Sequence, residues 1–210
     1  MGADCIANNL HFHLVYTDSM FEQFGEKEAY SFPIETATKK LFFKSELKHK
    51  DPNEMNMYSC PVRFGELPDW PLKTLILSPD VDGTKDDGEE ISLEDAQEAL
   101  SHTAGIVLNY FIELNIPHNI LIADEGMTIY IIPRKFDLLI EGVSFFTSFE
   151  SLCGFIKCKT QDSYNNMSYD QINQALRESV SVLETDFEKI KNDLVEKFMK
   201  EYEGARIQWE

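Results

Sequence analysis

The strongest chemical signal in the sequence is a short run near its start, Asn9-Leu10-His11-Phe12-His13. If this run is a β-strand, its period of two places Asn9, His11 and His13 on one face, with successive side chains on that face about 6 to 7 Å apart. One imidazole can then attack phosphorus as a nucleophile while the other holds a phosphoryl oxygen or protonates the leaving group. Alternating histidines also arise by chance on half-exposed strands, so the spacing alone leaves a purely structural role open. Arg63 and Arg134 are the cations that we expect to contact phosphate.

Alternating and continuous apolar runs predict the strands that would position these residues. Single strands are expected at four places: 6–16, 40–43, 70–77 and 154–158. Two further apolar runs are joined at Asp124-Glu125-Gly126, which predicts a hairpin over 118–133 with Gly126 at positive φ. The polar stretch 44–56 and the acidic stretch 80–90 are expected to be exposed loops.

Two helices are predicted by capping residues followed by apolar stripes of helical period. The first covers 92–115 and begins at Ser92, and the second covers 168–203 and begins at Ser168. This order of elements predicts a single α+β domain over 1–210, with a largely antiparallel sheet, helices packed on one face and a long C-terminal helix. There is no glycine-rich loop that would cradle a phosphate.

Composition and charge narrow the classes of partner. The 210 residues include 37 acids and 19 bases, giving a formal net charge of −18, which disfavours binding to nucleic acid or to anionic lipid. No apolar run approaches the roughly 18 residues of a membrane span, so we expect no membrane insertion. The four cysteines form no CxxC pair and make no metal-ligand set with the five histidines. We therefore expect no metal, no cofactor and a reducing intracellular compartment, the cytoplasm by default.

Three segments resemble parts of one enzyme family. The run Asn8 to His13 is similar to the HxHxH or HxHxQ motif of the histidine-triad (HIT) superfamily, and to an Asn-His-Leu-His-Phe stretch in its GDP-hexose phosphorylases. Cys60-Pro61-Val62-Arg63 resembles their Pro-Val-Arg segment, and the stretch from Asn115 to Pro133 resembles their hairpin. Glu150 and Gly154 are similar to part of a Glu-Ile-Ser-Gly-His segment. The resemblance runs in order along nearly the whole chain and corresponds to the C-terminal portion of a GDP-L-galactose or GDP-D-glucose phosphorylase with a HIT-like fold.

The resemblance implies a role for each residue of the motif. His11 would be the nucleophile that takes the guanylyl group from a GDP-hexose before phosphate releases GDP, and His13 would contact the transferred phosphate. Asn9 stands where the family has the first histidine, which orients the nucleophile, and Phe155 stands where a histidine is expected. In the family the triad also follows strands that supply much of the nucleotide pocket, whereas here it begins nine residues from the start. These departures point to a degenerate enzyme whose nucleotide pocket would need another chain.

Two hypotheses follow for the function. In the first, the chain is a guanylyl-transferring phosphorylase or hydrolase that works through His11, with nucleotide-sugar and phosphate as its ligands. In the second, it is a catalytically inactive HIT-like module that acts as a structural or interaction subunit of a larger assembly. In either case we expect a second copy or an unlike protein subunit as a partner, since the segment 7–16 needs a cover.

Overall fold

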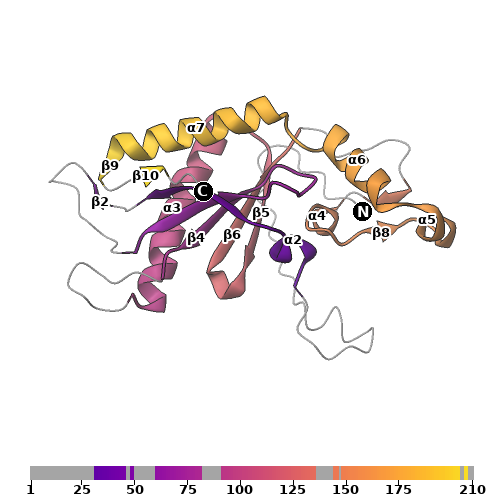
Figure 1. Cartoon of the computed structure of the whole chain (residues 1–210), viewed down its shortest axis with the longest axis horizontal. Coiled ribbons are helices and arrows are strands. Elements are labelled where there is room, and N and C mark those ends of the chain that lie inside the picture. Colours follow the sequence, from indigo (N-terminus) through magenta and orange to yellow (C-terminus); the bar gives the residue numbers. More distant parts are fainter. Residues whose placement is uncertain are drawn as a thin grey trace.

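The computed structural model describes residues 31–45, 48–49, 60–81, 91–135, 144–146, 148–203 and 206–207. Its elements, shown in Figure 1, are as follows: α2 (Pro33–Thr36), β1 (Lys40–Ser45), β2 (Lys48–His49), β3 (Val62–Glu66), β4 (Leu75–Pro79), α3 (Leu93–Glu113), β5 (His118–Ala123), the 3-10 turn η1 (Asp124–Gly126), β6 (Thr128–Pro133), β7 (Phe145–Phe146), α4 (Phe149–Leu152), β8 (Lys157–Cys158), α5 (Gln161–Asn166), α6 (Tyr169–Ser179), α7 (Glu184–Glu201), β9 (Tyr202–Glu203) and β10 (Arg206–Ile207). The segment 6–16, including the candidate residues Asn9, His11 and His13, lies outside the described residues, and its assignment as a strand stays a prediction.

The centre of the fold is an antiparallel sheet, as the sequence predicts. Among the described residues six strands form it, in the order β10-β1-β3-β4-β6-β5, and each neighbouring pair is antiparallel. The β5–β6 hairpin lies within the predicted range 118–133. Gly126 has a φ of 89°, and Asp124 and Glu125 before it also have positive φ, so three successive residues of the turn are left-handed.

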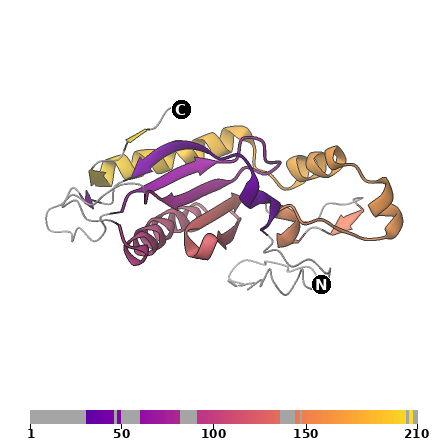
Figure 2. The same cartoon turned by 60° about the horizontal axis from the view of Figure 1, so that its bottom comes forward.

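The two longest helices pack together on one face of this sheet. Figure 2 shows α3 and α7 on the same side of the central strands. Alternate residues of the strands point into this layer, because Phe64 of β3 and Leu77 of β4 are fully buried there with Phe111 of α3 and Phe198 of α7. The aromatic rings of Phe64 and Phe198 lie 5.1 Å apart in an edge-to-face arrangement, which favours this packing beyond the area it buries.

The opposite face is partly covered by shorter elements. Ile76, Tyr130 and Ile132 alternate with the residues of the first layer and are buried on this side. Their cover consists of residues from α2, α4, α6 and the connections between them, including Ile34 and Leu176. Both faces of the sheet are therefore apolar over its central strands.

The C-terminal helix predicted over 168–203 is two helices in the structure. α6 ends at Ser179 and α7 begins at Glu184, and the residues between them are not helical. The break lets the two helices take opposite faces of the sheet, because Leu176 is buried in the second layer and Phe187 in the first. The apolar stripe continues through the break, so helical periodicity in the sequence could not reveal it.

Candidate functional site

Arg63 lies on the side of the sheet opposite α3 and α7. Its neighbours Val62 and Phe64 are buried under those helices, so the alternation of β3 turns Arg63 the other way. The strand register places Arg63 directly between Lys44 on β1 and Ser78 on β4. Lys44 and Arg63 are thus cross-strand neighbours on the same face.

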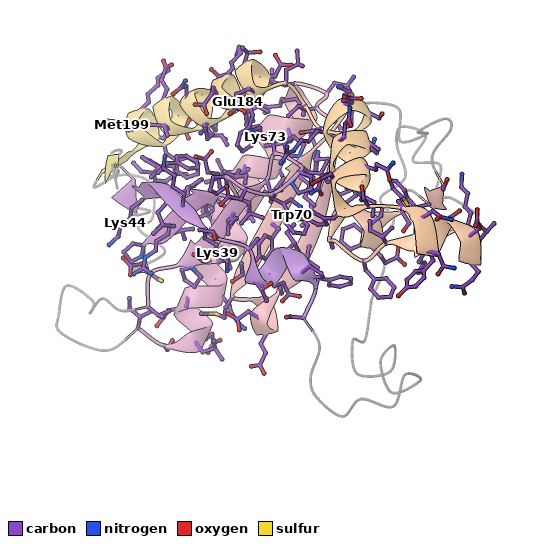
Figure 3. All side chains as sticks on the ribbon, turned by 45° about the vertical axis from the view of Figure 1, so that its right-hand side comes forward. Lys39, Lys44, Trp70, Lys73, Glu184 and Met199 are labelled. Carbon is purple, nitrogen blue, oxygen red and sulfur yellow. The ribbon has the colours of Figure 1, made fainter. Side chains whose placement is uncertain are left out.

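Both cations contact one carboxylate, Asp80, just after β4. The Lys44 ammonium lies 2.5 Å from one oxygen of Asp80, and the Arg63 guanidinium donates a hydrogen bond to the other oxygen. The Asp80 side chain is only 9% exposed, whereas those of Lys44 and Arg63 are 23% and 29% exposed. We call these two cations and one acid the Lys44–Arg63–Asp80 cluster. Figure 3 shows that Lys44, near the end of β1, lies away from Trp70.

The two cations keep Asp80 ionised. Burial alone would raise the pKa of Asp80, but the hydrogen bond from Lys44 and the charges of Arg63 and Lys44 outweigh it and hold the pKa below its ordinary value. The backbone N–H of Asp80 also donates to the carbonyl oxygen of Pro61 at 2.7 Å, which fixes the residue beside β3. The carboxylate therefore orients the two cations, whose side chains remain partly exposed.

Cys60, at the start of the segment that resembles Pro-Val-Arg, is a core residue. Its side chain is completely buried, and burial raises the pKa of the thiol to about 11. The thiol is therefore protonated at neutral pH and is a poor nucleophile. The segment contributes packing through Cys60 and Val62, and one charged side chain through Arg63.

Arg134, the other expected phosphate contact, is 6% exposed and holds two parts of the chain together. Its Nε donates to the side-chain oxygen of Asn119 at 3.0 Å, and one of its terminal nitrogens donates to the carbonyl oxygen of Lys135. Its backbone forms a β-bridge with Ser181, in the connection between α6 and α7. Arg134 thus ties the β5–β6 hairpin to the break in the C-terminal helices.

The structure does not bring Arg63 and Arg134 together. Arg63 pairs with Ser78 of β4, and the register of β4 with β6 places Ser78 level with Thr128, at the start of β6. Arg134 follows the other end of β6, six residues after Thr128, which corresponds to roughly 20 Å along an extended strand. One phosphate cannot contact both side chains at that separation.

The segment that resembles Glu-Ile-Ser-Gly-His is a packing element. Gly154 has a φ of 98°, and a Cβ atom placed on it would lie 2.8 Å from atoms of both Pro33 and Trp70. The Trp70 ring nitrogen donates to the carbonyl oxygen of Leu152 at 3.3 Å, and Phe155 packs on the same apolar cluster. Gly154 is therefore required by its positive φ and its close contact with Pro33 and Trp70. Phe155, the next residue, packs in the apolar layer.

Neither the largest hollow described along α6 nor any acidic, histidine or cysteine cluster offers a second site for phosphate or metal among the described residues. A hollow of about 560 Å³ lies along α6, but it is lined by Asp69, Asp170 and Glu178 against a single cation, Arg177, so its charge disfavours phosphate. In the part of the chain that the structure describes, no group of three or more His, Cys, Asp or Glu side chains could hold a metal ion. No helix in the same part is both long and apolar enough to cross a membrane.

The sequence analysis missed Lys44 and Asp80. Asp80 was expected to open a solvent-exposed acidic stretch, and that expectation is wrong for this residue because it is buried between two cations. The signal that could have found the cluster is the alternation along β1, in which the buried Phe43 turns Lys44 to the other face. The rest of the acidic stretch, 82–90, lies outside the described residues.

Comparison with known proteins gives one match. No curated protein matches the chain, and no solved structure matches it. The family model described as "GDPGP1-like, C-terminal domain" matches residues 46–201, more than two thirds of the chain. The match includes Arg63, Asp80 and Arg134 and begins after Asn9, His11 and His13. This chain belongs to the GDPGP1-like C-terminal domain family.

Proposed function

We propose that this chain is a degenerate GDP-hexose phosphorylase-like module, in which His11 accepts a guanylyl group and the Lys44–Arg63–Asp80 cluster contacts phosphate. The family match over 46–201 supports the relationship to GDP-hexose phosphorylases. The observation that carries the phosphate role is the placement of two partly exposed cations, Lys44 and Arg63, side by side on one face of the sheet in a chain with a net charge of −18.

The proposed reaction has two displacements at phosphorus. An imidazole nitrogen of His11 attacks the α-phosphorus of the GDP-hexose, a nitrogen–phosphorus bond forms, and hexose 1-phosphate leaves. An oxygen of inorganic phosphate then attacks the same phosphorus, the nitrogen–phosphorus bond breaks, and GDP is released with His11 restored. Asn9 replaces the orienting histidine, so we expect the first step to be slow.

The charge arrangement suits the second displacement. Inorganic phosphate is an anion that must approach another negatively charged phosphoryl group. Two cations held by a common carboxylate would reduce the repulsion between the phosphate and that phosphoryl group. Because Asp80 fixes Lys44 and Arg63 in the free protein, little ordering is needed when the anion arrives.

The test is covalent trapping with GDP-hexose labelled in the guanosine moiety. The unmodified chain should form an acid-labile guanylylated protein that phosphate discharges as GDP. His11→Ala should abolish the trapped species, Asn9→Ala should leave a remnant, and His102→Ala, on the exposed side of α3, serves as the matched histidine control. Equal labelling of the parent chain and His11→Ala would reject the assignment of the nucleophile.

A second candidate, a catalytically inactive structural or interaction subunit, is favoured by a specific observation. The segment that would carry another histidine instead has Phe155, which packs against the apolar cluster around Trp70. Failure of the folded parent chain to label or to bind GDP, together with formation of a stable oligomer, would favour this candidate over the first. A weakened affinity for GDP in Arg63→Ala would favour the first.

A further inference from the structure

A shift in strand register brings Leu41 and Lys44 to the same side of the sheet. Along β1 the pairing with β3 shifts between Leu41 and Phe43, as at a β-bulge, so Leu41 is level with Gly65 and Lys44 with Arg63. Gly65 and Arg63 are alternate residues of β3 and lie on the side away from α3 and α7. Side chains from both ends of β1 therefore reach the surface on which the Lys44–Arg63–Asp80 cluster lies.

Lys39, just before β1, supplies a further cation on this side of the sheet. Its ammonium lies 5.3 Å from the centre of the Tyr130 ring, and Tyr130 is buried in the second layer, on the side away from α3 and α7. The face of an aromatic ring attracts a cation, so this contact favours one position for the end of a long, flexible side chain. In Figure 3 Lys39 lies between Lys44 and Trp70.

The Lys39 ammonium has no acidic partner in the part of the chain that the structure describes. The acid just before it in the sequence, Glu35, instead accepts a hydrogen bond from the backbone N–H of Phe32 at 2.6 Å. Many other described lysines do contact a carboxylate: Lys44, Lys73, Lys157, Lys189, Lys191 and Lys197. Because an ammonium has three N–H donors and Lys39 is exposed, it can donate to an anion from solution.

The strand register gives the distance between the ring under Lys39 and the cluster. Tyr130 is level with Ile76 of β4, and Arg63 is level with Ser78 of the same strand. Tyr130 and Arg63 are thus two strands apart and two residues apart along the strands, which places their Cα atoms roughly 12 Å from each other. Lysine and arginine side chains are long enough to close much of that gap, so a ligand with two adjacent phosphoryl groups can contact Lys39 and Arg63 together.

We propose that Lys39 contacts the α-phosphoryl group of a guanosine nucleotide while the Lys44–Arg63–Asp80 cluster holds the neighbouring β-phosphate. This inference rests on the proposed function, in which the cluster contacts inorganic phosphate, because that phosphate becomes the β-phosphate of GDP. The charges match this division. A terminal phosphate carries about −1.5 to −2 at neutral pH and suits two cations, whereas a phosphoryl group inside a diphosphate carries a single negative charge and suits one ammonium.

Titration calorimetry on the full chain with GDP, GMP and inorganic phosphate tests this division of contacts. Lys39→Met removes the charge but keeps an unbranched side chain that can cover the Tyr130 ring. It should weaken the binding of GDP and of GMP by about tenfold or more and leave the binding of inorganic phosphate unchanged. Arg63→Ala should weaken the binding of GDP and of inorganic phosphate but not that of GMP, whose one phosphoryl group lies at Lys39.

Lys40→Met is the matched control. Lys40 is the next residue in the sequence and is also exposed, but it is level with Glu66, which faces α7 through its ion pair with Lys191. Lys40 is therefore on the other side of the sheet, and its variant should bind all three ligands as the parent does. Lys39→Arg keeps a cation that can stack on the ring, so its affinity for GDP should stay within about threefold of the parent value. Circular dichroism should show that these variants are folded, because both lysines are exposed.

The outcomes separate this inference from the proposed function. If Lys39→Met binds GDP within about twofold of the parent while Arg63→Ala binds it more weakly, the role of Lys39 is wrong and the proposed function stands. Equal losses in Lys39→Met and Lys40→Met would also overturn the role, because the effect would then come from net charge. Weakened binding of inorganic phosphate but not of GMP in Lys39→Met would overturn the assignment to the α-phosphoryl group. A folded parent chain that binds none of the three ligands would reject the proposed function and this inference with it.

Discussion

Replacing Gly154 by alanine should lower the free energy of unfolding by about 3 kcal/mol, because an L-residue at positive φ costs roughly 1–2 kcal/mol and overpacking costs a similar amount. The residue has a φ of 98°, and the new methyl group would lie 2.8 Å from carbon atoms of Pro33 and Trp70. Pro33 belongs to α2 and Trp70 is anchored to Leu152 by its ring nitrogen, so neither can move without disturbing the layer over the sheet.

Thermal and urea unfolding followed by circular dichroism measure this loss. For a chain of this size the melting temperature should fall by about 6–12 °C. Gly105→Ala is the matched control, since it adds the same methyl group in open space on a helix and should raise stability by about 0.5–1 kcal/mol. If Gly154→Ala unfolds within about 0.5 kcal/mol of the parent, the contact with Pro33 and Trp70 does not constrain this segment, and its assignment as a packing element is wrong.

Two further substitutions test the charged groups of the fold. Asp80→Asn should lower the free energy of unfolding by about 1 kcal/mol at neutral pH. The pKa of Asp80 is lower in the folded protein than its unfolded value near 3.9. The destabilisation should therefore be complete above about pH 3.9 and should vanish as the pH falls through the folded pKa. A difference in unfolding free energy that stays constant down to pH 2 would contradict this linkage. Glu66→Gln should lower the free energy of unfolding by about 1–3 kcal/mol in urea, since the Lys191 ammonium, 2.7 Å from Glu66, would keep one of its two ion pairs, with Glu188 at 2.6 Å. Equal stability of Glu66→Gln and the parent would show that Glu188 alone satisfies the buried lysine.

The helices and strands that are specified by neighbouring residues could be predicted from the sequence. The sequence predicts a helix over 92–115, and α3 covers Leu93–Glu113, with the Ser92 side chain accepting a hydrogen bond from the backbone of Asp95. Capping and helical period are properties of neighbouring residues, so they are visible without the rest of the chain. The antiparallel sheet and its hairpin follow in the same way from alternation and turn residues.

Features that depend on distant residues could not be predicted. The break between α6 and α7 occurs where Ser181 bridges to Arg134, nearly fifty residues earlier in the sequence. The strand expected over 70–77 begins only at Leu75, because Trp70 is engaged with Leu152 instead of a neighbouring strand. The Lys44–Arg63–Asp80 cluster likewise needs the pairing of β1, β3 and β4 before its members meet. Whether residues 1–210 form a single domain stays a prediction, as do the roles of Asn9, His11 and His13.

The placement of α6 and α7 on opposite faces of the sheet has a consequence for synthesis on the ribosome. The last strand of the hairpin is complete at Pro133, but the apolar residues that finish covering the two faces arrive with Leu176 and Phe198. At about 5–20 residues per second, translation of the intervening chain takes roughly 3–13 s. During that interval both sides of a largely formed sheet expose apolar surface, so the nascent chain is a substrate for chaperones until the end of α7 has emerged.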